Sequence, residues 1–511
     1  MPYDHLAEFL DHLHEAGQLA RVRASVAGNL ELAAVTERVV RNGDGTALLF
    51  ENVDGKRMPV VANLLGTRDR LLAALGGESL DEIADRVTAI VRPSLPTDWL
   101  QALQLVPRFV AAAEWPPHLV DSAVAQQVVL MGSDVDLDAL PIPVCWPGET
   151  MPTLTAAQLY VEKSPHESTS KPAGEAESPT SEPSAPLRQR LGSRVPVQIV
   201  DRNAVLIRWT PHDAEWHLVK EAAANGQPLP VAIVLGGDPV LTFAAGLPLP
   251  GFVDPLVIAG FLRQKSVAVT KARSADLFVP ANAEIVLEAL IDPRQAFDDA
   301  SPTAAATGFL TDSELAIRAT VTAVTHRSNP VLPVIVPVRP PGEEAVLAEA
   351  AERILLPLIR LAIPELVDLR LPAAGARRNI AFASIRKQYA QQARKVMNAL
   401  WGLDRLSTVK LLIVVESDVD VHNDEDVWFA VGANSHPGRD TIFSEGPADM
   451  LDHAAPKRGI GHRMGIDATR KLEDENHPRS WPEPLQADAE TQKLITSRWA
   501  EYGLGASQSF P

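Results

Sequence analysis

The sequence predicts a mixed α/β (α+β) protein built from three parts. Three changes of pattern support this prediction: helices mixed with strands up to about residue 120, short β-rich runs from about 125, and alternating strands and helices after about 326. A chain of 511 residues is also too long for one compact core. We therefore predict three domains, with boundaries at 1–120, 121–325 and 326–511.

The first part reads as a small α+β region. Apolar residues at helical spacing from Leu6 to Leu13 predict a helix within 4–22, and Asp4 is a suitable N-cap for it. The elements expected next are a helix in 30–45 that stops at Asn42-Gly43, strands at 46–53 and 59–65, and a helix at 68–76.

The second part is typical of an antiparallel barrel or sandwich. Its short β-rich runs are separated by Gly, Pro, Asp and Asn, and they lie at 126–132, 196–200, 204–209, 230–237 and 266–271. Residues 163–187 form a low-complexity stretch with almost no large apolar side chains. Such a stretch buries too little surface to offset the entropy lost on ordering, so we expect a disordered loop between two strands.

The third part has an α/β pattern. Expected elements are strands at 332–338, 380–385 and 409–417 and helices at 343–363 and 387–403. The run at 409–417 is continuously apolar, which is typical of a buried parallel strand. The tail ends in a segment, 490–504, that we interpret as a docking helix.

Composition excludes several classes of function. A net charge of -18 argues against nucleic acid or an anionic membrane as the main partner, because both require a basic face. No apolar run is long enough to span a membrane, and the N-terminus lacks the pattern of a signal peptide. The single cysteine, Cys145, excludes an internal disulfide and a CxxC metal site, and it fits a cytoplasmic location.

Two glycine- or acid-rich stretches have weak functional signals. Residues 459–465, GIGHRMG, faintly resemble a phosphate-binding loop, but we favour a turn-rich loop because the glycine spacing is wrong. Residues 416–426, ESDVDVHNDED, lack the spacing of a calcium loop, and we interpret them as a solvated strand end followed by helix N-terminal acids.

The stretch LIRWTPHD, residues 206–213, is a better candidate for a ligand site. A strand here delivers Arg208, Trp209 and His212 within five positions. Arginine pairs with phosphate, tryptophan covers a flat ring, and histidine binds a metal or moves a proton. Each residue alone is more often structural, but together they favour a strand end that faces a ligand.

Seven stretches, in order between about residue 5 and residue 470, resemble the UbiD family of decarboxylases. They are LAEFLDHLHEAGQLARV, ALLFENVDGKRMPVVANLLGTRDRLLAALG, LPIPVCWPGE, PVAIVLGGDPVLTFAAGLPLP, DLFVPANAEIVLEA, IRKQYAQQARKVM and RMGIDATRK. The resemblance implies an N-terminal α+β region, a central split β-barrel of the flavin-reductase type and a C-terminal α/β oligomerisation domain. It also implies reversible decarboxylation of aromatic or α,β-unsaturated acids with prenylated FMN, whose phosphate is held through Mn²⁺ with K⁺ nearby.

In that family an Arg holds the substrate carboxylate, one acid supports the Arg, and a second acid protonates the carbon after CO2 leaves. Alignment on the family motifs gives the equivalent positions in this chain: Ala300 and Ala305 for the acids, Pro196 for the Arg, and Leu191 and Pro255 for two metal ligands. These side chains neither transfer protons nor coordinate Mn²⁺. We therefore assign no catalytic or metal-binding residue by resemblance.

The cofactor-binding residues that the resemblance retains are Arg208, Trp209, His212 and Arg463, the last in place of a phosphate-side Lys. Three charged residues lie one or two positions from a required place, and a local bulge would bring each of them into it: Arg194, Asp299 and Asp254.

Three functions stay open from the sequence. The first is a UbiD-type carboxy-lyase whose acid/base groups are rearranged among Asp299, Arg194 and His212. The second is a pseudoenzyme that binds flavin or serves as the partner subunit of an active UbiD-type protein. The third is an interaction scaffold that uses the acidic surface and residues 163–187. The family resemblance implies a homo-oligomer, a dimer or hexamer.

Overall fold

The protein was analysed as a computed structural model, which describes residues 3–92, 115–162, 190–211, 213–295, 297–311 and 314–475 and, in the tail, 477, 479–482, 485 and 487–503. His212 and the predicted loop 163–187 lie outside these residues.

The N-terminal region packs helices against a small sheet, as predicted. Its sheet has the order β1-β2-β3-β17, and its last strand comes from far along the chain. The elements are α1 (Leu6–Glu15), β1 (Leu19–Val26), α2 (Glu31–Arg41), β2 (Ala47–Val53), β3 (Val60–Ala62), α3 (Arg68–Leu75), α4 (Leu80–Val91) and β17 (Leu332–Val334).

Two details of the first predicted helix are wrong. The helix ends at Glu15, because the chain turns at Gly17 and then enters β1. The φ of 69° at Gly17 is readily adopted by glycine and disfavoured for other residues. His5, and not Asp4, occupies the N-cap position, with no side-chain capping bond. The Asp4 carboxylate instead pairs with Arg263 at 2.8 Å and Lys265 at 2.7 Å, which are stronger charge-assisted contacts than one amide offers.

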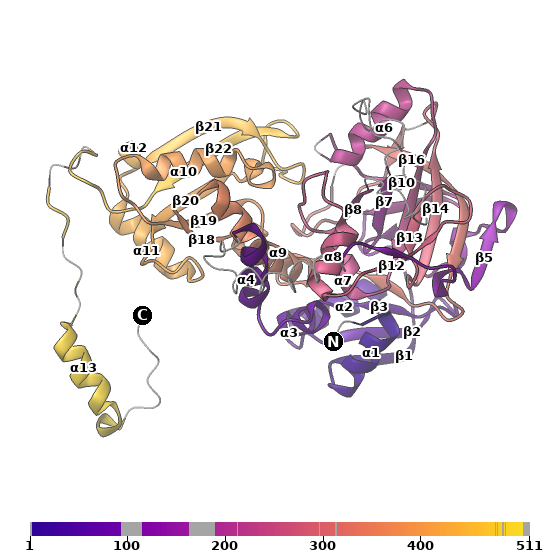
Figure 1. Cartoon of the computed structure of the whole chain (residues 1–511), viewed down its shortest axis with the longest axis horizontal. Helices are drawn as coiled ribbons and strands as arrows, with labels where there is room; N and C mark the ends of the chain where they lie inside the picture. The colour runs from indigo at the N-terminus through magenta and orange to yellow at the C-terminus, as the bar shows by residue number, and fades with distance from the viewer. Residues whose placement is uncertain are drawn as a thin grey trace, which may run out of the picture.

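The central part is a ten-stranded antiparallel sheet that curls into a half-barrel (Figure 1), with the order β6-β9-β10-β16-β14-β11-β7-β8 and with β5 and β15 beside β16. The predicted loop 163–187 joins β7 to β8, which are paired neighbours. The strands of this sheet are β5 (Val128–Met131), β6 (Thr153–Leu154), β7 (Gln158–Glu162), β8 (Arg190–Arg194), β9 (Val197–Asp201), β10 (Ala204–Ile207), β11 (Leu229–Leu235), β14 (Ile285–Ile291), β15 (Phe297–Ala300) and β16 (Glu314–His326).

Three helices and a small second sheet accompany the half-barrel. The helices are α6 (Ala214–Ala224), α7 (Pro239–Ala245) and α8 (Pro255–Arg263), and the small sheet contains β4 (His118–Leu119), β12 (Ala268–Lys271) and β13 (Phe278–Pro280). Helices α7 and α8 share one apolar core with α1, α3 and α4, so the barrel and the N-terminal region are packed together.

The C-terminal domain is a five-stranded sheet of order β18-β19-β20-β22-β21, and α9 leads into it from the barrel (Figure 1). The three inner strands are parallel, and the two edge strands are antiparallel. The elements are α9 (Glu343–Ala362), β18 (Leu366–Arg370), β19 (Ile380–Ile385), α10 (Gln392–Trp401), η6 (Asp404–Thr408), β20 (Leu411–Glu416), α11 (Asp424–Asn434), α12 (Pro437–Asp440), β21 (Thr441–Pro447), β22 (Ile460–Asp467) and α13 (Ala489–Arg498).

Most predicted elements of this domain are confirmed, and the acidic stretch is indeed a strand end followed by acids in the first turn of α11. The interpretation of 459–465 as a loop is wrong, because Ile460–Asp467 forms β22, bonded to strands on both sides. Helix α13 buries no side chain, and it lies apart from the rest of the chain in Figure 1. None of the described helices combines the length and hydropathy needed to cross a membrane.

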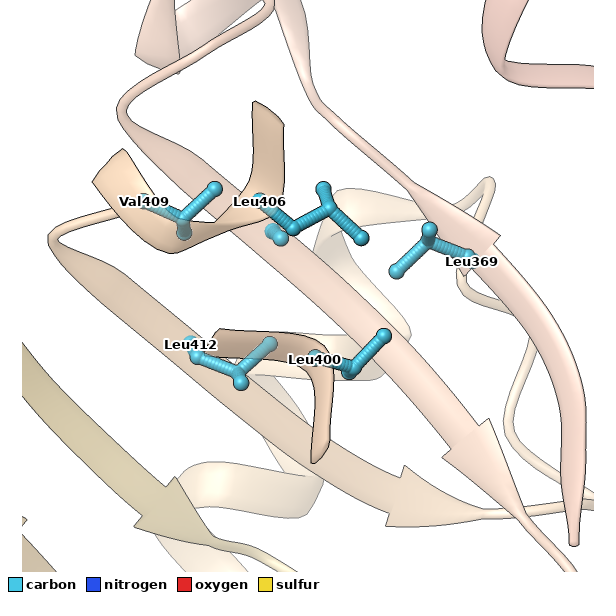
Figure 2. Close-up of a pocket in the computed structure, with 6 residues that line it drawn as sticks. Leu369, Leu400, Leu406, Val409 and Leu412 are labelled. Atoms are coloured by element: carbon cyan, nitrogen blue, oxygen red, sulfur yellow. The ribbon is translucent and has the colours of Figure 1, made fainter. Parts of the chain in front are cut away.

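The core of this sheet is tightly filled. Figure 2 shows leucine and valine side chains converging between α10, η6 and the strands, among them Leu400, Leu406 and Leu412. The gap between them has no room for a water molecule, so it is too small to be a ligand site. This packing fixes η6 at the start of β20.

Helix α9 is anchored to the N-terminal region by its first residue. The Glu343 carboxylate accepts a 2.7 Å hydrogen bond from the backbone N–H of Leu65 and is buried. Burial raises the pKa of Glu343 to about 7, against smaller opposing effects of the Leu65 amide and Arg70. The next residue, Glu344, is thereby held at the cavity described below.

We predict that this carboxyl makes stability depend on pH. Folded Glu343 binds its proton up to about pH 7, whereas the unfolded chain releases it near pH 4.5. Its contribution is therefore complete below about pH 4.5 and is lost as pH rises through about 7, by up to about 1.4 kcal/mol per pH unit. Urea unfolding of Glu343→Gln should show a flatter dependence between pH 5 and 7.5 than the parent protein. Parallel curves for the two proteins would contradict the assignment.

Candidate functional site

A cavity of about 620 Å³ lies between the half-barrel and the C-terminal domain. This volume is within the range of sites for small ligands and cofactors. Its walls come from the end of β8, the residues after β10, the loop after α7, one face of α9, and the loops that precede β19 and β20. Three of the five positions aligned with the family's catalytic or metal-binding residues line it: Leu191, Pro196 and Ala305.

Arg194 and Glu344 form a two-pronged ion pair in the cavity wall. The two guanidinium nitrogens lie 2.5 and 2.9 Å from the two carboxylate oxygens, and the Arg194 side chain is only 10% exposed. Burial would raise the pKa of Glu344, but the charge of Arg194 outweighs it and holds that pKa below its usual value. The third nitrogen, Nε of Arg194, is buried and has no partner among the described residues. Each terminal nitrogen carries a second N–H, so an arginine fixed in this way can hold the carboxylate of a ligand.

A second carboxyl, that of Glu215, faces the cavity from the first turn of α6. Burial raises its pKa, and hydrogen bonds from its own backbone and from Ser193 oppose that rise. Ser193 also accepts a 2.9 Å hydrogen bond from the indole N–H of Trp209. Trp209 therefore positions Ser193, and Ser193 in turn positions a carboxyl that holds its proton more tightly than usual. Such a group can donate a proton to a ligand.

Arg208 is tied to the loop that contains the run of alanines. Its guanidinium donates to the carbonyl of Ser301 and, at 3.1 Å, to the hydroxyl of Thr311. Backbone N–H of Ala304 donates to Glu149 at 2.7 Å, which fixes the same loop from the other side. The cavity wall at Thr303–Ala306 is thus rigidly held but presents no acid.

The structure separates the other residues predicted from the sequence. Arg208 lines the cavity and Trp209 is buried behind it, whereas Arg463 is not among the lining residues. The Arg463 guanidinium lies 5.0 Å from the ring centre of Trp401 and donates to Ser407 and Ser444. His212 lies outside the described residues. The assignment of these four side chains to a cofactor stays a prediction.

Of the three charged residues near an aligned position, only Arg194 lines the cavity. Asp254 caps α8, accepting from Leu256 N–H at 2.8 Å, and pairs with Arg190 at 2.7 Å. Asp299 lies exposed on β15. Sequence reasoning missed Glu215 and Glu344, although Glu215 lies only two residues after the stretch 206–213 that was singled out.

No described group of three or more His, Cys, Asp and Glu side chains is arranged to hold a metal ion. Leu191, at a position aligned with a metal ligand, is buried and apolar. The described residues therefore do not fit a protein-held divalent ion. They do fit a flavin, because the cavity has the required size and arginines in its wall.

Family models match most of the chain. The N-terminal, Rift-related and C-terminal domain models of 3-octaprenyl-4-hydroxybenzoate carboxy-lyase match residues 10–87, 190–340 and 345–468. An uncharacterized protein of Aquifex aeolicus is 35% identical over 98% of the chain and 99% of its own length. One of Archaeoglobus fulgidus is 36% identical over the same shares.

Solved structures share the fold. The UbiD-class enzyme HmfF from Pelotomaculum thermopropionicum, in complex with FMN, is 27% identical with a TM-score of 0.74, and the match covers 96% of this chain and 99% of that one. Vanillic acid decarboxylase of Sedimentibacter hydroxybenzoicus in its closed form reaches a TM-score of 0.81 at 24% identity, covering 98% and 100%. The half-barrel and its two neighbouring regions are therefore arranged as in these enzymes.

We predict that Glu344→Gln destabilises the protein by about 3 kcal/mol, because it leaves the buried Arg194 without its counter-charge. The double variant Arg194→Met/Glu344→Leu should recover most of that loss, since it removes both charges. Chemical denaturation of the three proteins at pH 7 measures this. A loss below about 1 kcal/mol for Glu344→Gln would mean that the pair behaves like an exposed surface ion pair.

Proposed function

Because the chain belongs to the UbiD family of decarboxylases, we propose that its cavity binds a flavin, prenylated FMN, and exchanges CO2 reversibly with an aromatic or α,β-unsaturated acid. The observation that carries this proposal is the group Arg194, Glu344 and Glu215 in one cavity wall. The solved HmfF structures with FMN and with prFMN support the choice of cofactor.

The proposed division of roles follows from the contacts. Arg194 binds the substrate carboxylate through the N–H groups of its two terminal nitrogens that do not point at Glu344, while Glu344 fixes the orientation of the guanidinium. The flavin, when bound, supplies an electron sink for the carbon that loses CO2. Glu215 delivers a proton to that carbon after the C–C bond breaks, and takes it back in the carboxylation direction. The family's Arg would thus be replaced by Arg194, two residues before the aligned position, and its two acids by groups from α9 and α6.

The second candidate is a non-catalytic homologue, a flavin-binding protein or the partner subunit of an active UbiD-type enzyme. It is favoured by Ala305 and Leu191, which line the cavity where the family places an acid and a metal ligand. A homo-oligomer, either a dimer or a hexamer, is part of both proposals. A scaffold function based on residues 163–187 stays a prediction, because those residues lie outside the described ones.

The two candidates separate in one experiment. Protein produced alongside a prenyl-FMN synthase is examined by its ultraviolet-visible spectrum and metal content. It is then incubated with a panel of aromatic and enoic acids and with their decarboxylated products in D₂O. The proposed function requires CO2 release or deuterium exchange by flavin-loaded protein. Bound flavin in a one-to-one ratio without either reaction across the panel would favour the non-catalytic homologue.

We predict that Glu215→Gln retains flavin but lowers deuterium exchange by about 10²–10⁴-fold, the usual contribution of a positioned proton donor. Asp299→Asn is the matched control, since it removes a carboxyl that lies beside an aligned position but on an exposed strand. Exchange by that control should equal the parent rate. Unchanged exchange by Glu215→Gln would exclude this carboxyl as the donor.

A further inference from the structure

Two arginines of the C-terminal domain face the Arg194–Glu344 pair across the cavity. Arg378 precedes β19, and Arg405 lies in η6, just before β20. These strands are parallel neighbours, with Ile380 opposite Leu411, so their starts lie side by side at one edge of the sheet. Both arginines line the cavity.

The charges at this edge do not balance. Arg194 pairs with Glu344, and Arg378 lies 3.1 Å from the carboxylate of Asp449. Arg405 has no hydrogen bond through its guanidinium and no ion pair with any residue in the described part of the chain. Three guanidinium groups therefore share two carboxylates, and one positive charge is left over.

The unbalanced charge lies in the cavity wall. Arg405 is an exposed residue of that wall, and the protein around it together with the repulsion of Arg378 lowers its pKa to about 10. Asp449 and Glu344 oppose this shift without cancelling it. Holding one cation next to two others costs free energy, and an anion in the cavity would remove that cost.

Two other arginines in this domain show what a structural role requires. Arg377 also lines the cavity, but it donates to the carbonyl of Leu371 at 3.1 Å and to Glu349. Arg463 bonds to Ser407 and Ser444 and lies against Trp401. Arg405 makes no such contact, so packing and internal hydrogen bonds do not explain it.

We propose that Arg378 and Arg405 form an oxyanion-binding site on the C-terminal side of the cavity, for a phosphate or carboxylate group of a ligand that lies between the two domains. The planar guanidinium presents paired donors that match two oxygens of such a group. The oxyanion has two candidate sources, the phosphate of a bound flavin and a second acidic group on another ligand. The site does not depend on decarboxylation, and its test requires neither flavin nor turnover.

The test uses inorganic phosphate and phthalate as probes on the purified full chain, measured by titration calorimetry. Arg405→Gln should weaken binding of the probe by about tenfold to hundredfold, as expected for a lost hydrogen bond to a charged group. Arg405→Lys keeps the charge but not the paired donors, so its affinity for the probe should lie between those of the parent protein and of Arg405→Gln. Arg377→Gln is the control, because it changes the net charge equally but should weaken binding far less than Arg405→Gln, since the Arg377 guanidinium is already engaged by Leu371 and Glu349.

The unfolding temperatures of the variants, measured without any probe, distinguish an arginine of a ligand site from a structural arginine. Arg405→Gln should unfold at the same or a higher temperature than the parent protein, since it removes repulsion. Arg377→Gln should unfold at a lower temperature, since it leaves a carbonyl and a carboxylate without their partner. Phosphate should raise the unfolding temperature of the parent and of Arg377→Gln but not of Arg405→Gln.

The source of the oxyanion follows from competition between phosphate and flavins. Phosphate that competes with FMN but not with riboflavin identifies the flavin phosphate as the occupant, and binding alongside FMN identifies a separate ligand. Either result supports the site. It would be overturned if the parent protein bound neither probe saturably, or if Arg405→Gln bound them as tightly as Arg377→Gln. Loss of flavin binding alone would count against the proposed function and not against this site.

Discussion

The ion pair between Arg194 and Glu344 is the interaction on which the cavity depends. Arg194 ends strand β8 of the half-barrel, and Glu344 lies in the first turn of α9, the helix that leads into the C-terminal domain. Glu343 beside it bonds to Leu65 in the N-terminal region. All three parts of the chain therefore meet at two consecutive glutamates, and a shift of α9 would have to break a buried, two-pronged charge pair.

The other walls of the cavity decide whether the run of alanines at 304–306 removes the proton donor. An acid missing from that loop removes a proton donor only if no other wall of the cavity supplies one. Glu215 approaches from α6, and its burial and the Trp209–Ser193 contacts hold it there.

Positive charge is concentrated at the cavity. The chain carries a net charge of -18, yet several arginines line this cavity. An acidic surface with an arginine-lined interior favours anionic ligands at this site over the rest of the surface.

Local patterns in the sequence were enough to predict most of the fold. Helical spacing predicted α1 to α3 and α9, and apolar runs predicted β20 and four strands of the half-barrel, β5, β9, β10 and β11. The run at 266–271 was assigned to the same barrel, but it forms β12 of the small second sheet. Long-range pairing could not be predicted, because nothing near Leu332 indicates that β17 joins β3 in the N-terminal sheet. GIGHRMG was misinterpreted for a related reason. Three glycines in a short segment indicate a turn, but two neighbouring strands hold residues from Ile460 onwards extended as β22.

The site was harder to predict than the fold. Arg208 and Arg194 line the cavity; the first was singled out together with Trp209 from their spacing, and the second from its nearness to an aligned position. Glu344 lies 150 residues from Arg194 in the chain, and only the tertiary fold, which places the start of α9 at the end of β8, brings them together. Arg378 and Arg405 come from separate loops that meet because β19 and β20 are parallel neighbours. Alignment to family motifs compares one position with one position, so it does not detect groups that reach the same cavity from other elements.

The most direct test of this account is a crystal structure of the flavin-loaded protein with an aromatic carboxylic acid bound. We predict that the acid lies between the half-barrel and the C-terminal domain, with its carboxylate within hydrogen-bonding distance of the Arg194 guanidinium and its ring carbon facing the Glu215 carboxyl. An acid bound away from Arg194, or a Glu215 side chain turned out of the cavity in that complex, would contradict the account.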